Sequence, residues 1–266
     1  MHRTSTRLLC AAACALAFAL LALPGCSGPE VEQPEEPAYV SPYDWSGLAK
    51  ENSRFTYSEG GKIRSLAGID VSEHQGSIDW NAVASDGIDF AFVRIGNRGA
   101  TEGSIYLDKH YEENMAGAAK AGILLGVYFF SQAITPEEAE EEADFVLSAL
   151  RGAELSFPVV YDHEPVSGIE GRADKLSRAE RTENAVAFCE RISAAGYEPM
   201  IYGNKRDIAR LDMSRLEGID VWFAEYGVET PSGQFDFTIW QYASDGTVAG
   251  IATPVDMNIL FIAEDQ

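Results

Sequence analysis

Short apolar runs alternate with helical patterns from residue 68 onward, and this alternation limits the possible folds more than any other feature. Eight runs are typical of strands, at 68–71, 90–95, 124–130, 158–162, 199–202, 221–224, 238–242 and 255–260. Helical patterns cover 78–85, 109–121, 136–150 and 175–195. Such alternation predicts an α/β fold with a parallel sheet and crossover helices, and eight strands indicate a closed TIM-like barrel. Segments with little helical pattern join the last three strands, so we expect the final third of the barrel to be irregular.

The first 26 residues have the pattern of an export signal. Arg3 and Arg7 precede an apolar run over 8–23, which is short for a membrane span, and Pro24-Gly25-Cys26 follows it. The ending resembles a bacterial lipobox, which implies a lipid chain on Cys26 that anchors the protein to the outer face of a membrane. Because Pro24 is unusual in a lipobox, secretion with cleavage nearby is the alternative. In either case we expect an exported protein at or beyond the cell surface.

Composition divides the rest of the chain into three parts. Residues 27–44 are rich in Pro and Glu and poor in core-forming residues, which predicts an extended acidic spacer. Residues 45–67 contain two short β-like runs around Ser58-Glu59-Gly60-Gly61, which predict a small hairpin to which we assign no function. Residues 68–266 form the predicted barrel, and we expect a monomer.

Charge and cysteine content argue against several classes of protein. The chain has 42 Asp and Glu against 20 Lys and Arg, and its net charge of -22 argues against nucleic acid as a partner. Cys189 is the only cysteine beyond the export signal, so it has no internal disulfide partner, and its helical setting predicts a buried thiol. The sequence implies no metal and no cofactor, because the histidines outside the signal form no pair at ligand spacing.

Two carboxylates follow the apolar run of the fourth predicted strand. In Val159-Val160-Tyr161-Asp162-His163-Glu164 the acids stand two positions apart, and side chains two apart on a strand share a face. Like charges so close raise at least one pKa, so one carboxyl group can donate a proton near neutral pH while the other stays ionised. Taken alone, the pair has a simpler interpretation, a solvated Asp-x-Glu at the start of a loop.

Other polar residues lie at the ends of the predicted strands, where catalytic residues gather in parallel barrels. They are Asp70, Tyr128, Tyr202, Glu225, Tyr226, Trp240, Gln241 and Asp256. Aromatic faces stack on sugar rings, amides and carboxylates hydrogen-bond to hydroxyl and acetamido groups, and paired acids cleave glycosidic bonds. The set indicates a carbohydrate site at the barrel mouth, which outweighs the loop interpretation of Asp162 and Glu164.

Six motifs follow one another along the predicted barrel. They are Gly68-Ile69-Asp70-Val71-Ser72-Glu73-His74-Gln75-Gly76-Ser77-Ile78-Asp79-Trp80, Phe92-Val93-Arg94-Ile95-Gly96, Gly126-Val127-Tyr128-Phe129-Phe130-Ser131, Asp162-His163-Glu164, Trp240-Gln241-Tyr242 and Val255-Asp256-Met257-Asn258. In this order they resemble glycoside hydrolase family 25, the lysozymes of the Chalaropsis type. The resemblance implies a modified barrel of five βα units followed by three strands. It also implies cleavage of the β-1,4 bond between N-acetylmuramic acid and N-acetylglucosamine in the glycan strands of peptidoglycan.

The resemblance implies roles for the acids. Glu164 matches the general acid that protonates the leaving oxygen, Asp162 matches its partner carboxylate, and Asp70 and Asp256 line the site. The candidate substrate-binding residues are Tyr128, Tyr202, Glu225, Tyr226, Trp240 and Gln241. Because both acids of the pair lie on one side of the scissile bond, they favour a substrate-assisted mechanism with retention of configuration, although Asp256 could approach from another side.

Two positions depart from the family pattern, and two other functions stay open. Arg94 stands where many members have Lys, and His163 stands where many have an aliphatic residue; His163 should point away from the acids, toward the helices. One alternative is a surface glycan-binding lipoprotein without catalysis, against which the intact set of acids argues. The other is a chitinase-like glycosidase, which normally carries a longer ladder of acids before its Glu than Asp162 provides.

Overall fold

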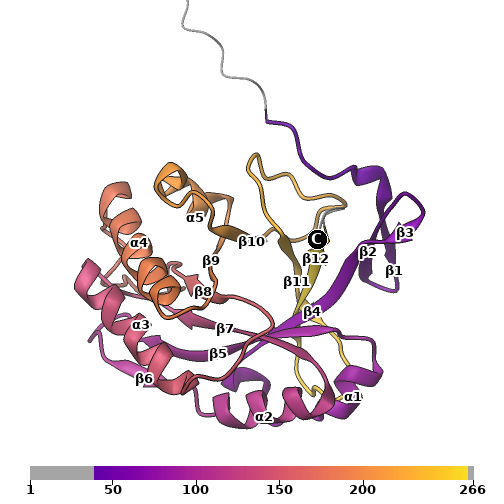
Figure 1. The fold of residues 1–266 in the computed structure, drawn as a ribbon, viewed down its shortest axis with the longest axis horizontal. Helices are drawn as coiled ribbons and strands as arrows, with labels where there is room; N and C mark the ends of the chain where they lie inside the picture. The colour runs from indigo at the N-terminus through magenta and orange to yellow at the C-terminus, as the bar shows by residue number, and fades with distance from the viewer. Residues whose placement is uncertain (1–38, 263–266) are drawn as a thin grey trace, which may run out of the picture. The chain divides into compact units, whose positions relative to one another are not determined.

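Eight strands close into a barrel in the computed structural model, which describes residues 39–262 (Figure 1). In order around the ring they are β4 (Ser65–Val71), β5 (Phe90–Arg98), β7 (Leu124–Phe130), β8 (Val159–Asp162), β9 (Pro199–Asn204), β10 (Asp220–Ala224), β11 (Ile239–Gly246) and β12 (Val255–Phe261). β12 pairs with β4 and completes the ring. One more strand, β6 (Ile105–Leu107), pairs with β5 outside it. The predicted α/β barrel of eight strands is confirmed.

One helix follows each of the first five barrel strands. The helices are α1 (Trp80–Ser85), α2 (Tyr111–Ala121), α3 (Pro136–Leu150), α4 (Arg178–Ala194) and α5 (Lys205–Ala209), and short 3₁₀ helices occur at Trp45–Gly47, Glu73–Gln75 and Met213–Arg215. Capping residues explain where the helices begin: the Thr135 side chain accepts a hydrogen bond from the Glu138 amide, and Ser177 and Glu180 form a capping box. The result is five βα units followed by three strands, as the family resemblance implies.

The last barrel strand runs against the others, so the expectation of a parallel sheet was wrong for this strand. β12 pairs antiparallel with β11 and β4, whereas all other neighbours in the ring are parallel. Residues 247–254 alone connect β11 to β12, which is too short for the helical crossover of a parallel connection. The start of β12 therefore lies at the same end of the barrel as the carboxyl ends of its neighbours, and Asp256 pairs with Asp70.

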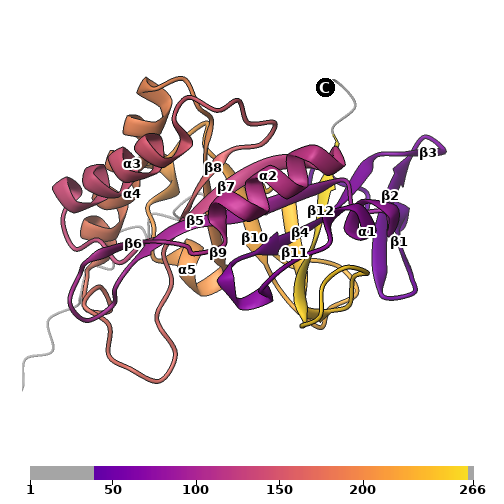
Figure 2. The same ribbon diagram turned by 90° about the horizontal axis from the view of Figure 1, so that it is seen from below.

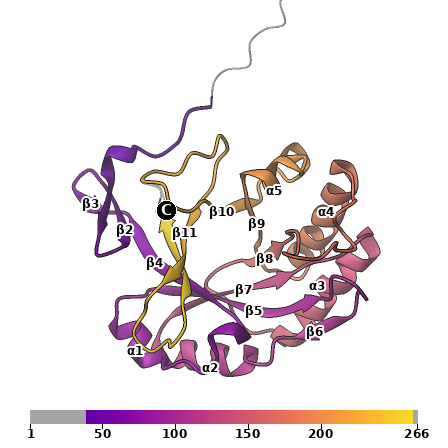
Figure 3. The same cartoon turned by 180° about the vertical axis from the view of Figure 1, so that it is seen from behind.

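A small antiparallel sheet covers part of the barrel that lacks helices. Its strands are β1 (Leu48–Glu51), β2 (Arg54–Glu59) and β3 (Lys62–Ile63). It lies beside the yellow strands in Figures 1 and 3, at the other end of the molecule from α3 and α4 in Figure 2. The ring centroid of Phe55 lies 4.7 Å from that of Trp240 and 5.0 Å from that of Tyr242, both on β11. Aromatic packing thus attaches this N-terminal sheet to the outer surface of the barrel.

One apolar layer lies inside the barrel wall, and a second lies outside it. The interior is filled by Phe90, Phe92, Val160, Met200, Trp222 and Ile239. The Phe92 and Trp222 rings stack with their centroids 4.6 Å apart. Since these large side chains fill the amino-terminal part of the barrel, the remaining open space lies at the carboxyl-terminal mouth.

The export signal at 1–26, with Cys26, lies outside the described residues. Within 39–262 the longest helices are too short or too polar to cross a lipid bilayer. Cys189 is buried in α4 as a free thiol, and burial raises its pKa to about 12. Burial of this thiol was the expectation from sequence.

Candidate active site

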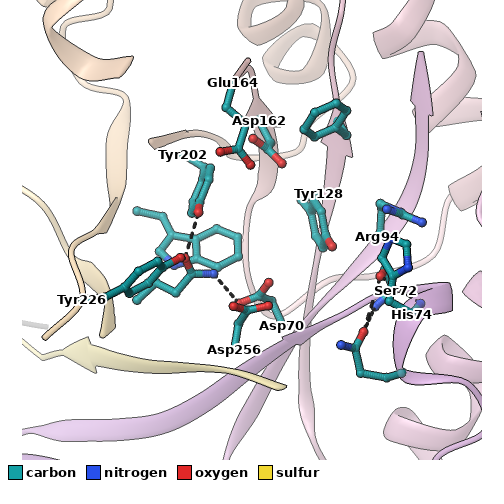
Figure 4. A pocket seen from close by; sticks show the side chains of 14 residues that line it. Asp70, Ser72, His74, Arg94, Tyr128, Asp162, Glu164, Tyr202, Tyr226 and Asp256 are labelled. Atoms are coloured by element: carbon teal, nitrogen blue, oxygen red, sulfur yellow. Dashed lines mark hydrogen bonds between the residues drawn. The ribbon is translucent and has the colours of Figure 1, made fainter. Parts of the chain in front are cut away.

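A pocket of about 290 Å³ opens at the carboxyl-terminal mouth of the barrel (Figure 4). Barrel strands supply most of its lining: Asp70, Arg94, Tyr128, Phe130, Asp162, Tyr202, Trp222, Gln241 and Asp256. The segments that follow β4, β8 and β10 add Ser72, His74, Gln75, Glu164 and Tyr226. The four acids singled out from the sequence therefore line one pocket, at the end of the barrel where catalytic residues gather in this class of fold.

Asp162 and Glu164 enter the pocket from β8 and the loop after it. Asp162 is the last residue of the strand and is buried, and its Oδ1 atom accepts no hydrogen bond from the described residues. The Glu164 backbone is held from the neighbouring loop, because the buried Gln132 side chain donates from Nε2 to the Glu164 carbonyl oxygen at 2.9 Å. The two-residue spacing thus delivers both carboxylates to the pocket, with an oxygen of Asp162 left without a protein partner.

Asp70 and Asp256 form a second pair of acids across the pocket. They are direct cross-strand partners on β4 and β12, which brings their side chains close. Asp70 Oδ2 accepts hydrogen bonds from Gln241 Nε2 at 2.8 Å and Asn258 Nδ2 at 2.9 Å. Four steps around the ring separate β12 from β8 in either direction, so Asp256 faces Glu164 from the opposite wall (Figure 4). The pocket therefore presents carboxylates to two sides of a bound molecule.

Burial raises the pKa values of all four acids, and repulsion between carboxylates adds to the rise for Asp70, Asp162 and Glu164. For Glu164 the pKa rises to about 7, first because of burial and then because of the carboxylates of Asp207 and Asp256. Burial raises the pKa of Asp256 to about 6. The pKa values of Asp70 and Asp162 are also raised, by burial first and then by the nearest carboxylate. The pocket can thus hold protons on carboxyl groups near neutral pH.

Gln241 connects one acid pair to two tyrosines. It is buried, and its Oε1 atom accepts hydrogen bonds from the hydroxyl groups of Tyr202, at 2.8 Å, and Tyr226. Burial raises the pKa values of both tyrosines and of Tyr128, so the three phenols stay protonated. Gln241 also donates to Asp70, so both ends of its side-chain amide are bound to protein groups. Its main effect is therefore to fix the positions of Asp70 and the two tyrosines in the pocket wall.

Two candidate substrate-binding residues do not reach the pocket. Neighbouring residues on a strand point to opposite faces, so Trp240 points outward because Gln241 points into the barrel. The Trp240 side chain is also fully buried. Its ring packs on Phe55, and its Nε1 atom donates to the Glu225 carbonyl oxygen at 2.8 Å. The Glu225 carboxylate is turned toward Lys205, at 2.7 Å, and Ser232. The Trp240 side chain therefore lies on the outer face of the barrel, whereas Glu225 lines a cavity beside the pocket.

Arg94 and His163, the two residues that depart from the family pattern, each contact a specific protein side chain. Arg94 lines the pocket and binds the buried Asp108 through Nε at 2.9 Å and Nη2 at 2.8 Å, so its charge is balanced at the rim. His163 points away from the acids, as expected, and its ring nitrogens lie 3.3 Å from Arg181 Nη1 on α4. Burial and then Arg181 lower the pKa of His163 to about 4, so this histidine is neutral.

Two residues in or beside the pocket had no assigned role in the sequence. Asn258 holds Asp70 and also accepts from Trp222 Nε1 at 2.8 Å, which ties the pocket floor to the acids. Asn258 stands two residues after Asp256 on the same strand face, so the strand period could have found it. His74 also lines the pocket. Among the described residues no three His, Cys, Asp or Glu side chains are arranged to hold a metal ion.

Comparisons with known proteins agree with this geometry. The model of the family described as glycosyl hydrolases family 25 matches residues 69–251. Lysozyme M1 of Streptomyces globisporus is 30% identical over 205 residues, which cover 73% of this chain and 67% of that protein. The autolytic lysozyme of Clostridium acetobutylicum is 28% identical over 193 residues, 73% of this chain, and the match spans only 55% of the relative's length.

A solved structure shares the same fold. The bacterial lysozyme from Streptomyces coelicolor aligns with a TM-score of 0.58 and 27% identity, over 73% of this chain and 90% of that one. The family match covers more than half of the chain and spans three of the four pocket acids, Asp70, Asp162 and Glu164. The chain therefore belongs to glycosyl hydrolases family 25.

Proposed function

We propose that this protein is a peptidoglycan muramidase, which hydrolyses the β-1,4 bond between N-acetylmuramic acid and N-acetylglucosamine. The observation that carries the proposal is the set of four carboxylates that line one pocket, two of them buried and two half-buried, with the pKa of Glu164 raised to about 7. Family membership and the similarity to proteins named lysozymes support the same substrate. The intact acid set speaks against a binding protein that has lost catalysis.

In this proposal Glu164 is the general acid. Its raised pKa keeps a proton available near neutral pH, as protonation of a leaving oxygen requires. Asp162 is its partner, because it lines the same pocket two residues before Glu164. Asp162 then stabilises the positive charge that develops when the 2-acetamido group of the muramic sugar attacks the anomeric carbon. This substrate-assisted route retains the configuration.

The position of Asp256 supports a second route. It faces Glu164 from the opposite wall, where a carboxylate can activate water for direct displacement with inversion. Proton NMR of the first product distinguishes the two routes. We expect the β anomer from the substrate-assisted route, and an α anomer would assign Asp256 the role of general base.

The central experiment is mass spectrometry of fragments released from purified peptidoglycan. The unmodified protein should release muropeptides with reducing muramic acid ends. Glu164→Gln should lower the rate by about 10²–10⁴-fold, the usual cost of losing a general acid. Glu154→Gln, at an exposed glutamate outside the pocket, is the matched control. If the unmodified protein bound the polymer without releasing fragments, the glycan-binding alternative would replace the muramidase; reducing N-acetylglucosamine ends would indicate a chitinase-like cut.

We also propose that residues 1–26 direct export and that Cys26 carries a lipid anchor, with 27–44 as a spacer before the sheet and barrel. The lipobox-like sequence before Cys26 supports this. Cys26→Ala should shed the protein into the medium without loss of specific activity. Membrane retention equal to that of the unmodified protein would refute the anchor, and release of the unmodified protein would favour plain secretion.

A further inference from the structure

Glu164 lies on a loop and not on a barrel strand. β8 ends at Asp162, and residues 163–177 form neither helix nor strand before α4 begins at Arg178. A general acid must be held close to the atom that it protonates, and a small misplacement is costly. Contacts that fix the first residues of this segment, which we call the acid loop, therefore bear on the proposed reaction.

A buried arginine binds the far end of the acid loop. Arg181, near the start of α4, is only 4% exposed. Its Nε atom donates to the Leu176 carbonyl oxygen at 3.2 Å, and its Nη2 atom donates to the carbonyl oxygens of Ala173 and Asp174, each at 2.8 Å. A buried cation needs hydrogen-bond partners for its donors, so these contacts hold residues 173–176 in place.

The same guanidinium reaches the near end of the acid loop. Both ring nitrogens of His163 lie 3.3 Å from Arg181 Nη1. A guanidinium can only donate, so the ring accepts through an unprotonated nitrogen. The His163 ring also lies 11° from parallel to the Tyr161 ring, and the adjoining space is about 10 Å³, room for no more than one water molecule. The histidine ring therefore has little freedom to turn.

Arg181 thus connects the beginning of the acid loop to its end. His163 stands directly between Asp162 and Glu164, and adjacent side chains of an extended segment point to opposite sides. Holding the His163 ring outside the barrel wall therefore holds the next side chain toward the pocket. We propose that Arg181 and His163 are positioning residues, which keep the Glu164 carboxyl group directed at the glycosidic oxygen. The inference rests on the proposed muramidase function.

Two contacts hold the acid loop from different sides. Gln132 binds the main-chain carbonyl oxygen of Glu164 from the loop after β7, whereas Arg181 acts from α4 through the side chain of the preceding residue. Together they restrain the backbone of the acid and the direction of its side chain. An aliphatic residue in place of His163, as many family members have, could not accept a hydrogen bond from Arg181. The second contact is therefore a feature of this chain.

Two replacements of His163 in the full chain test the inference. His163→Leu removes the acceptor and should lower kcat for the release of reducing ends from uncrosslinked glycan strands by about 10–10²-fold. KM should stay within about twofold, since His163 does not line the pocket. His163→Gln keeps an acceptor oxygen, so its kcat should stay within about threefold of the unmodified protein. A role in stability alone predicts a lower free energy of unfolding and an unchanged kcat of the folded protein.

Arg181→Lys tests the other partner and keeps the charge. An ammonium group cannot replace the forked contacts of a guanidinium, so kcat should fall here too. Because both side chains act through one contact, Arg181→Lys combined with His163→Leu should lower kcat no further than the larger single loss. Losses that multiply would overturn the inference. So would an unchanged kcat in either folded single variant, or equal losses in His163→Leu and His163→Gln.

His110→Leu is the matched control. This histidine precedes α2, lies 3.0 Å from Glu113 through Nδ1 and does not line the pocket, so kcat and KM should stay unchanged. Failure of the proposed function looks different, because the unmodified protein would then release no reducing ends from strands, and the inference would fall with it.

Discussion

At the scale of single residues, the proton on Glu164 is controlled in part by a carboxylate that takes no part in the proposed reaction. Its pKa rises because the side chain is buried and because the carboxylates of Asp207 and Asp256 oppose its ionisation. Asp207 lies on α5, outside the pocket. A residue without a role in bond breaking can therefore set the pH range over which the acid works.

Replacing Asp207 with asparagine should shift the alkaline limb of the activity profile. Asp207→Asn removes a negative charge, so the pKa of Glu164 falls below about 7 and the acid loses its proton at lower pH. The kcat/KM profile should then decline at lower pH than in the unmodified protein. Asp144→Asn, on an exposed part of α3, is the control and should leave the profile unchanged. An unmoved alkaline limb in Asp207→Asn would show that Asp207 has no influence on the acid.

The raised pKa of Glu164 also predicts how stability depends on pH. Between about 4.5, its ordinary value, and about 7 the folded protein holds this proton while the unfolded chain has lost it. The stabilisation from the bound proton is thus present below pH 4.5 and is lost as pH rises to about 7. Glu164→Gln lacks this penalty, so its free energy of unfolding should exceed that of the unmodified protein at pH 7 and approach it at pH 4.5. Urea unfolding at both pH values measures this, and an equal difference at the two values would contradict it.

At the scale of elements, the loop that carries Glu164 is held by a chain of contacts from α3. Arg172 binds Glu138 with both Nη atoms, at 2.6 and 2.7 Å, and also donates to the Gln132 carbonyl oxygen at 3.1 Å. The Gln132 side chain in turn holds the Glu164 carbonyl oxygen. The loop after β8 is therefore fixed to the loop after β7, and the acid does not depend on its own strand alone for its position.

Gln132→Ala should lower kcat while the alkaline limb keeps its position. Loss of this hydrogen bond frees the Glu164 backbone, and a displaced catalytic group costs on the order of 10–10² in rate. Burial and neighbouring charges still control the proton, so the pH profile should keep its shape. Gln234→Ala, at an exposed glutamine, is the control. An unchanged kcat in a folded Gln132→Ala protein would show that the loop holds Glu164 without this contact.

The sequence predicted the eight barrel strands, the first four helices and the four acids, because each depends on local patterns. Side chains alternate between the two faces of a strand with a period of two residues. This period explains why Asp162 and Glu164 share the pocket, and why Gln241 faces the pocket while Trp240, also predicted to bind substrate, points away from it. The positions of Gln132 and Asp207 around Glu164 could not be predicted, since only the closed fold brings these distant segments together. The antiparallel direction of β12 follows from the short connection, residues 247–254, between β11 and β12.

At the scale of the whole molecule, the segment that precedes the N-terminal sheet lies at the end of the barrel opposite the pocket. The Tyr43 hydroxyl group donates to the Phe237 carbonyl oxygen at 3.0 Å, just before β11 begins and therefore at the end opposite the pocket. From there the N-terminal sheet covers β11 and β12, where Tyr57 and Phe261 meet with ring centroids 5.5 Å apart. The sheet thus completes the outer layer that helices provide around the rest of the barrel.

This packing predicts that the N-terminal sheet and the barrel unfold together. Phe55 is 4% exposed and contacts Trp240 and Tyr242, so Phe55→Ala leaves a cavity between the two sheets and should cost about 3–5 kcal/mol of unfolding free energy. Ile63→Ala, in the same small sheet but 71% exposed, should change it by less than about 0.5 kcal/mol. Urea unfolding should show one transition that Phe55→Ala moves as a whole. Two separate transitions, with the barrel unaffected by Phe55→Ala, would mean that the sheet only rests on the barrel and adds nothing to its stability.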